Sequence, residues 1–164
     1  MPFILVRIDD RMIHGQVVVG WASALHPQLI VLCHDAIAQN SWEKELYESS
    51  YPDTDFKICV FSASELLSYY HSKAFQKERC ILLFETPTFA LNLLCCGVHF
   101  EKLNIGGLHF RAETRALNNY IYLNQEDINS LLQLQKLNVQ IEGQDVPNAK
   151  KFDVMAAIQK LLKK

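Results

Sequence analysis

The sequence contains no hydrophobic run that approaches the roughly 20 residues needed for a membrane-spanning helix. It also lacks a cluster of lysine and arginine before the Lys163-Lys164 pair, and its formal net charge is −2. Proteins that bind nucleic acids usually carry a basic patch, so we expect no nucleic acid among its partners. Because the first residues form a strand-like pattern without a basic segment or a cleavage site, we expect no secretory signal.

Cysteine pairs of the CxxC type are also absent, which leaves a zinc ribbon or a thiol redox motif without support. The chain has five cysteines, an odd number, and they lie in or beside hydrophobic runs. We interpret them as free thiols of a protein in a reducing cytoplasm, where disulfides are rare.

What the sequence does contain is a regular alternation of strand-like and helix-like segments. Its 164 residues suit one domain spanning 1–164, and 49% hydrophobic residues suffice for a full core. The alternation predicts an α/β fold: a three-layer sandwich with a mostly parallel central sheet of about six or seven strands and helices on both faces. The predicted strands are 3–8, 29–33, 56–61, 80–84, 103–107, 119–123 and 139–143. The predicted helices are 14–25, 36–49, 62–70, 86–97, 125–137 and 148–162.

Polar residues follow several of these strands at their carboxyl ends, where open parallel sheets bind ligands. The first strand runs into Asp9-Asp10-Arg11-Met12-Ile13-His14-Gly15-Gln16. The later strands are followed by His34 and Asp35, by Ser62, by Glu85, Thr86 and Pro87, and by Gly106, Gly107, His109 and Arg111. The sequence therefore predicts a functional site at this edge of the sheet.

The turn at 9–16 has the groups that a phosphohistidine site needs. An exposed, neutral imidazole such as that of His14 can attack phosphorus. Arg11 and the loop amides can meet the phosphoryl charge, and Asp10 can orient the ring or balance its positive form. The alternative interpretation is a solvated Asp10–Arg11 pair beside a histidine at a helix start.

Other chemistries fit the pattern less well. A phospho-aspartate receiver needs a carboxylate after the third strand and a lysine after the fifth, where this chain has Ser62 and Gly106-Gly107. G-x-G-x-x-G, a P-loop lysine and G-x-S-x-G are all absent. A metal-dependent hydrolase remains as a less favoured alternative. Its ligands would be Asp9 or Asp10 with His14, His34 and His109, although no histidines are spaced i, i+4.

Several segments together resemble one protein family. RIDDRMIHGQV at 7–17 with the following Trp21, LLFETPTFA at 82–90 and LNIGGLHFR at 103–111 are similar to the enzyme IIB component of the mannose/sorbose/fructose class of the sugar phosphotransferase system. The segments 118–134 and 139–147 also match in their expected places. The resemblance thus extends over nearly the whole chain.

The resemblance implies a cytoplasmic phosphotransferase, at most peripherally associated with a membrane transporter. Its histidine, matching His14, would accept a phosphoryl group at Nδ1 from enzyme IIA and pass it to a sugar held by the membrane components IIC and IID. No cofactor and no metal is implied, and self-association is left open. The implied phosphate-binding residues are Asp10, Arg11, Met12, Ile13 and Gly15, with Met12 also expected to dock enzyme IIA. The further residues expected to line the site are Asp9, Gln16, His34, Asp35, Thr86, His109 and Arg111.

The chain departs from the family pattern outside the first loop. Ala112-Glu113-Thr114 stand where a Gly-Lys turn is usual, and Gly143-Gln144 stand where Val-Arg is frequent. His34-Asp35 replaces a usual Asn-Asp or Ser-Asp. These departures keep a second hypothesis open: a regulatory phosphorelay module that uses the same histidine without sugar transport.

Overall fold

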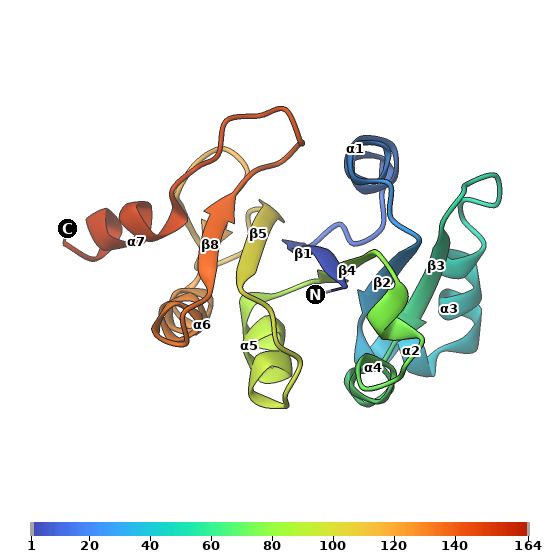
Figure 1. The fold of residues 1–164 in the computed structure, drawn as a ribbon. Helices are drawn as coiled ribbons and strands as arrows, with labels where there is room; N and C mark the ends of the chain where they lie inside the picture. Colours follow the sequence, from blue (N-terminus) through green and yellow to red (C-terminus); the bar gives the residue numbers. More distant parts are fainter. Residues whose placement is uncertain (1, 164) are drawn as a thin grey trace.

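The computed structural model describes residues 2–163 and has a six-stranded, wholly parallel sheet at its centre (Figure 1). The strand order is β3-β2-β4-β1-β5-β8. The strands are β1 Phe3–Asp9, β2 Leu29–Cys33, β3 Lys57–Phe61, β4 Cys80–Phe84, β5 Lys102–Gly107 and β8 Gln140–Gly143. The predicted α/β fold with a mostly parallel sheet is confirmed.

The helices lie on both faces of this sheet. Figure 1 shows η1 and α1 on one side of the strands and α5 and α6 on the other. One hydrophobic core cluster lies between one face of the sheet and the helices η1, α2 and α3. A larger cluster lies between the other face and the helices α4, α5, α6 and α7. The helices are η1 Gln16–Ala22, α1 Ser23–Leu25, α2 Asp35–Gln39, α3 Ser41–Glu48, α4 Ala63–Tyr70, η2 Phe75–Lys77, α5 Pro87–Cys95, α6 Gln125–Lys136 and α7 Val154–Leu162.

The hydrophobic runs explain which strands are central. LIVLC in β2 and CILLF in β4 are buried at every position, as expected for parallel strands covered on both faces. The β1 strand is different, because its buried half includes the charged residues Arg7 and Asp9.

Local signals in the sequence set several helix ends. Ser62 and Glu65 form the predicted capping box of α4, and Thr86 caps α5 with Pro87 in its first turn. Asn138 follows α6 with φ 65°, the left-handed conformation that commonly ends a helix.

Four predicted elements differ from the structure. The predicted helix at 14–25 is the π-helix η1 followed by the single turn α1. The predicted helix at 36–49 is divided at Asn40, which is extended and accepts a hydrogen bond from the Glu43 N–H to cap α3. The predicted strand at 119–123 is the short β7 Tyr122–Leu123, paired antiparallel with β6 Arg115–Ala116 outside the main sheet. The last helix begins only at Val154, because Asp153 caps it.

Gly106 in β5 leaves the space that the Arg7 side chain occupies. A Cβ atom at this position would lie 1.8 Å from the Arg7 Cζ atom, far inside contact distance. The substitution Gly106→Ala should therefore displace the Arg7 guanidinium and lower the free energy of unfolding by about 1–3 kcal/mol. Urea denaturation measures this effect, with Gly20→Ala as the control, because a Cβ at Gly20 makes only an ordinary 3.6 Å contact with Pro147. Equal stability of the two variants would contradict the prediction.

Candidate active site at the end of β1

Asp9, the last residue of β1, lies between two arginines. Its side chain and that of Arg7 are both fully buried, with Arg7 Nη2 2.9 Å from Asp9 Oδ2. Arg11 donates from Nε to Asp9 Oδ1 at 2.9 Å and from Nη2 to Oδ2 at 3.0 Å. The Arg11–Asp9 pair is therefore bidentate, the geometry in which arginine binds a carboxylate most strongly.

The two arginines keep the Asp9 carboxylate ionised. Burial alone raises the pKa of Asp9, but the hydrogen bond from Arg11 and the charge of Arg7 outweigh it, so the pKa lies below its ordinary value. The bond to Asp9 raises the pKa of Arg11. Burial lowers the pKa of Arg7, and Asp9 opposes that shift. The site therefore holds a permanent negative charge between positive ones.

Arg7 connects Asp9 to distant parts of the chain. Its Nη1 donates to Asn104 Oδ1 and to the Gln144 carbonyl, and its Nη2 donates to the Asp145 carbonyl at 3.0 Å. The guanidinium also lies 5.2 Å from the centre of the Trp21 ring, whose Nε1 donates to the same Asp145 carbonyl. One buried side chain thus holds β1, β5, η1 and the segment after β8 together.

His14 approaches the same carboxylate from the loop. The Met12 N–H donates to the Asp9 carbonyl and closes a turn in which Met12 has φ 60°. This turn returns the chain toward the end of β1. His14 Nδ1 lies 2.9 Å from the Met12 carbonyl oxygen, which can only accept, so Nδ1 carries the proton. His14 Nε2 is buried 3.8 Å from Asp9 Oδ2 and has no hydrogen-bond partner within residues 2–163. We call Arg7, Asp9, Arg11 and His14 the Asp9 cluster.

Asp10 faces the neighbouring strand and not His14. Its Oδ1 lies 2.6 Å from His109 Nδ1, its Oδ2 accepts from the His109 N–H, and its own N–H donates to the Gly107 carbonyl. The sequence prediction gave Asp10 the position beside the His14 imidazole, but Asp9 occupies that position. Asp10 and His109 instead join the ends of β1 and β5.

The other predicted loop residues differ in their surroundings. Ile13 is buried in the core cluster below η1, and Met12 accepts a contact from the Tyr47 hydroxyl to its Sδ at 3.5 Å. Gly15 is exposed, and a Cβ added there would meet nothing within 4 Å. Gln16 has a buried Oε1 without a partner among the described residues. The open side of the loop is therefore at Gly15.

Among the predicted lining residues after β2, β4 and β5, His109 lies beside the Asp9 cluster, because a Cβ at Gly107 would contact both Asp9 Oδ1 at 3.3 Å and His109 Cε1 at 3.4 Å. The others make structural contacts of their own. His34 Nε2 lies 3.1 Å from Glu85 Oε2, and Asp35 accepts from the Ala63 N–H at the start of α4. Thr86 caps α5, and Arg111 pairs with Asp127 of α6 at 3.0 Å.

Local sequence patterns did not identify Arg7, Asn104 or the carbonyls of 144–145 as parts of the site. The available signal was an arginine inside the hydrophobic strand FILVRI, combined with the glycine pair in NIGG. A buried arginine needs a carboxylate partner and space for its guanidinium, and Asp9 and Gly106 provide these.

Within residues 2–163, no helix is both long and hydrophobic enough to span a bilayer. Across the same part of the chain, no three histidine, cysteine or acidic side chains converge as metal ligands.

Known proteins are similar to this chain in both sequence and fold. The family described as the PTS system sorbose subfamily IIB component matches residues 3–164. The chain belongs to this family.

The chain is similar to named members of the family over most of its length. It is 32% identical over 142 residues to the sorbose-specific EIIB component of Klebsiella pneumoniae, covering 87% of this chain and 86% of the relative. It is 29% identical over 163 residues to the fructose-specific EIIB component of Bacillus subtilis (strain 168), covering 99% of each. The crystal structure of the IIBSor domain of the Klebsiella pneumoniae sorbose permease superimposes with a TM-score of 0.90 at 30% identity, covering 98% of both chains.

The substitution Asp9→Asn tests the role of the buried carboxylate in this EIIB component. Because it leaves Arg7 without a charged partner, we expect the free energy of unfolding near pH 7 to fall by about 3–5 kcal/mol. The native pKa of Asp9 lies below its unfolded value, so its contribution is present above the unfolded pKa and is lost as pH falls through the native pKa. The difference between native protein and variant should therefore shrink on acidification.

Urea denaturation across this pH range measures both effects. Asp55→Asn, at an exposed carboxylate, is the matched control and should change the stability little. If the two variants had equal stability near pH 7, Asp9 would not have the structural role assigned here.

Proposed function

We propose that this EIIB component is a phosphocarrier in which His14 accepts a phosphoryl group from an enzyme IIA and passes it to a sugar bound by the membrane components IIC and IID. The observation that carries the proposal is the imidazole of His14 beside the buried, ionised Asp9. The chain is also 30% identical over 157 residues to the mannose-specific EIIAB component of Escherichia coli (strain K12), spanning 48% of that relative, whose name joins a IIA to a IIB part. This supports a IIA donor.

The transfer requires a ring nitrogen with a free lone pair. That lone pair attacks phosphorus, the P–N bond of the phosphohistidine donor breaks, and the electron pair returns to the donor ring. The family resemblance implies Nδ1 as the acceptor, and in the structure Nδ1 donates to the Met12 carbonyl. The proposed step therefore begins when the ring leaves Met12 and its proton moves to Nε2.

Asp9 then has an electrostatic role. A ring that bears phosphoryl on Nδ1 and a proton on Nε2 is positively charged. Because Nε2 already lies 3.8 Å from Asp9 Oδ2 in a buried setting, a small movement of the ring makes a charged hydrogen bond. The carboxylate stabilises the phosphorylated form more than the free histidine.

Arg11 is the proposed phosphoryl ligand. Its Nε and Nη2 donate hydrogen bonds to Asp9, and its side chain remains 32% exposed. The rest of its guanidinium can therefore meet the phosphoryl oxygens, together with amides of the turn from Met12 to Gly15. Asp10 acts through His109 as a positioning residue for the loop.

The departure from the family at Gly143 and Gln144 has a structural explanation. A Cβ at Gly143 would lie 2.8 Å from Ile121 Cδ1. The Gln144 amide nitrogen donates to the carbonyls of Pro147 and Ala149 and so fixes the following segment. These contacts give no separate support to the regulatory alternative.

The variant His14→Gln tests the acceptor directly. Incubation with phosphoenolpyruvate, the general phosphotransferase proteins and an enzyme IIA should give the native protein an acid-labile mass increase of one phosphate that maps to His14. The variant should remain unlabelled, because its amide cannot accept phosphoryl from the donor. His34→Gln, at the same edge of the sheet, should be labelled like the native protein, and labelling of His14→Gln would refute the assignment.

Arg11→Lys tests the phosphoryl ligand. Lysine keeps the charge but cannot make the bidentate pair with Asp9, so we expect phosphorylation to be about 10- to 100-fold slower. Single-turnover transfer from saturating phospho-IIA measures this step without contribution from docking. The control is Arg115→Lys on the exposed strand β6, and equal rates for both variants would exclude Arg11 as a phosphoryl ligand.

A further inference from the structure

His109 follows the end of β5 and is bound to Asp10 through two of its nitrogens. Its backbone N–H donates to Asp10 Oδ2, and its ring Nδ1 lies 2.6 Å from Asp10 Oδ1. An ionised carboxylate only accepts hydrogen bonds, so Nδ1 carries a proton. In the neutral ring the lone pair is then on Nε2, and the side chain is 53% exposed. Nε2 is therefore the ring nitrogen that can meet a further group.

The His109 ring lies beside the guanidinium of Arg11. A Cβ built on Gly107 would be 3.3 Å from Arg11 Nη2 and 3.4 Å from His109 Cε1, the carbon bonded to Nε2. The two side chains thus border the same small space. Nη2 donates to Asp9 Oδ2, which leaves its second hydrogen for another acceptor. A phosphoryl group bound by Arg11 is therefore within reach of the His109 ring.

The cations near the end of β1 are already paired with carboxylates. Arg7 is fully buried against Asp9, and Arg11 donates to the same carboxylate from two side-chain nitrogens. Arg111, the next cation after His109, pairs with a carboxylate of α6. A phosphoryl group brings about two negative charges, so a further positive charge at its side is favourable. A protonated His109 supplies that charge.

We propose that His109 is a second ligand of the phosphoryl group on His14, in addition to Arg11; this rests on the proposed phosphorylation of His14. Nε2 of His109 takes up a proton from solvent and donates it in a hydrogen bond to a phosphoryl oxygen. Nδ1 continues to donate to Asp10, whose negative charge balances the imidazolium. The proton returns to solvent when the phosphoryl group leaves. A charged donor of this kind stabilises the phosphorylated form more than a neutral one does.

Long-range ¹H–¹⁵N spectra of the whole chain, recorded at pH 7.5 before and after phosphorylation by an enzyme IIA, follow the protonation of Nε2. An ordinary imidazole is mostly neutral at this pH. We expect the protonated fraction of the His109 ring to rise severalfold once His14 carries the phosphoryl group. An unchanged fraction beside a phosphorylated His14 would overturn the inference, and so would a phosphoryl group on His109 itself.

The substitution His109→Asn separates this role from the positioning of the loop. The asparagine amide can take the place of Nδ1 on Asp10 but has no counterpart of Nε2. We expect the equilibrium constant for phosphoryl transfer from phospho-IIA to fall by about tenfold. Because the phosphorylated native protein holds one more proton, acidification from pH 8 to pH 7 should favour it more than it favours the phosphorylated variant.

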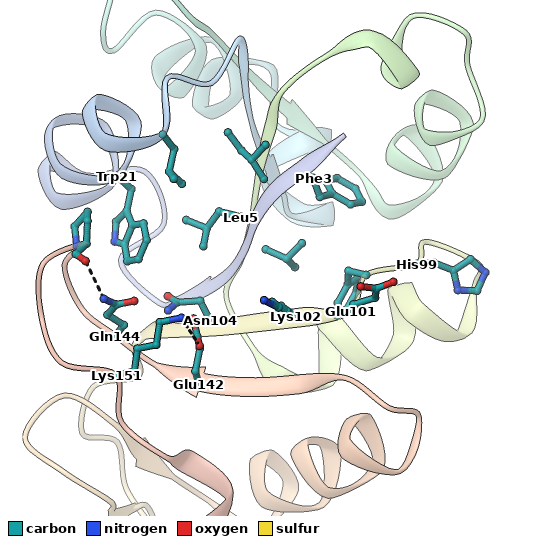
Figure 2. A pocket seen from close by; sticks show the side chains of 15 residues that line it. Phe3, Leu5, Trp21, His99, Glu101, Lys102, Asn104, Glu142, Gln144 and Lys151 are labelled. Carbon is teal, nitrogen blue, oxygen red and sulfur yellow. Dashed lines mark hydrogen bonds and ion pairs between the residues drawn. The ribbon is translucent and has the colours of Figure 1, made fainter. Parts of the chain in front are cut away.

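His99→Asn is the matched control. His99 is exposed and precedes β5, whereas His109 follows that strand. Figure 2 shows His99 at the edge of a separate cavity, apart from Asn104 and Gln144. Its replacement should leave the equilibrium constant and its pH dependence unchanged.

The outcomes distinguish this inference from the proposed function. If His109→Asn had the native equilibrium constant and pH dependence, His109 would only position the loop, and the inference would be wrong although His14 is phosphorylated. If the native protein gained no phosphoryl group on His14, the proposed function would be wrong and the inference with it.

Discussion

The buried carboxylate of Asp9 receives hydrogen bonds from Arg7 and Arg11 and faces His14, and the surrounding structure depends on this arrangement. Breaking a buried ion pair is far more damaging than replacing it as a whole. The chain therefore surrounds this pair with fixed partners. Gly106 leaves space for the guanidinium of Arg7, and Gly107 allows β5 to end beside Asp9. The NIGG segment of β5 therefore accommodates the Arg7–Asp9 ion pair in addition to pairing with the neighbouring strands.

The same arrangement links the fold to the proposed chemistry. Arg7 contacts three separate segments, namely β5, η1 and the segment after β8, so the position of Asp9 is set by the body of the protein and not by the loop. The loop then brings only Arg11 and His14 to a carboxylate that is already in place. An electrostatic partner fixed in advance needs little reorganisation when a charge develops next to it. This pre-set carboxylate is what the proposed phosphoryl transfer through His14 requires of so short a turn.

The sequence predicted the parallel sheet well because its strands are continuous hydrophobic runs and its helices start at clear caps. It predicted the loop at 9–16 for the same reason, since that loop follows a strand. It could not show that Asp9 rather than Asp10 faces His14, because adjacent residues at a strand end point to opposite sides and the turn at Met12 decides which side the loop covers. Contacts between β1, β5 and the segment after β8 depend on topology, so the partners of Arg7 could not be derived from local patterns. The strand predicted at 119–123 is reduced to β7 outside the main sheet, and its partner β6 was missed because a two-residue strand leaves almost no periodicity to detect.

The most direct test of this account is long-range ¹H–¹⁵N NMR on the phosphorylated, uniformly ¹⁵N-labelled protein, which identifies the substituted and the protonated nitrogen of the His14 ring. The account predicts phosphoryl on Nδ1 and a proton on Nε2, held toward Asp9. Phosphoryl on Nε2, or on any residue other than His14, would contradict it.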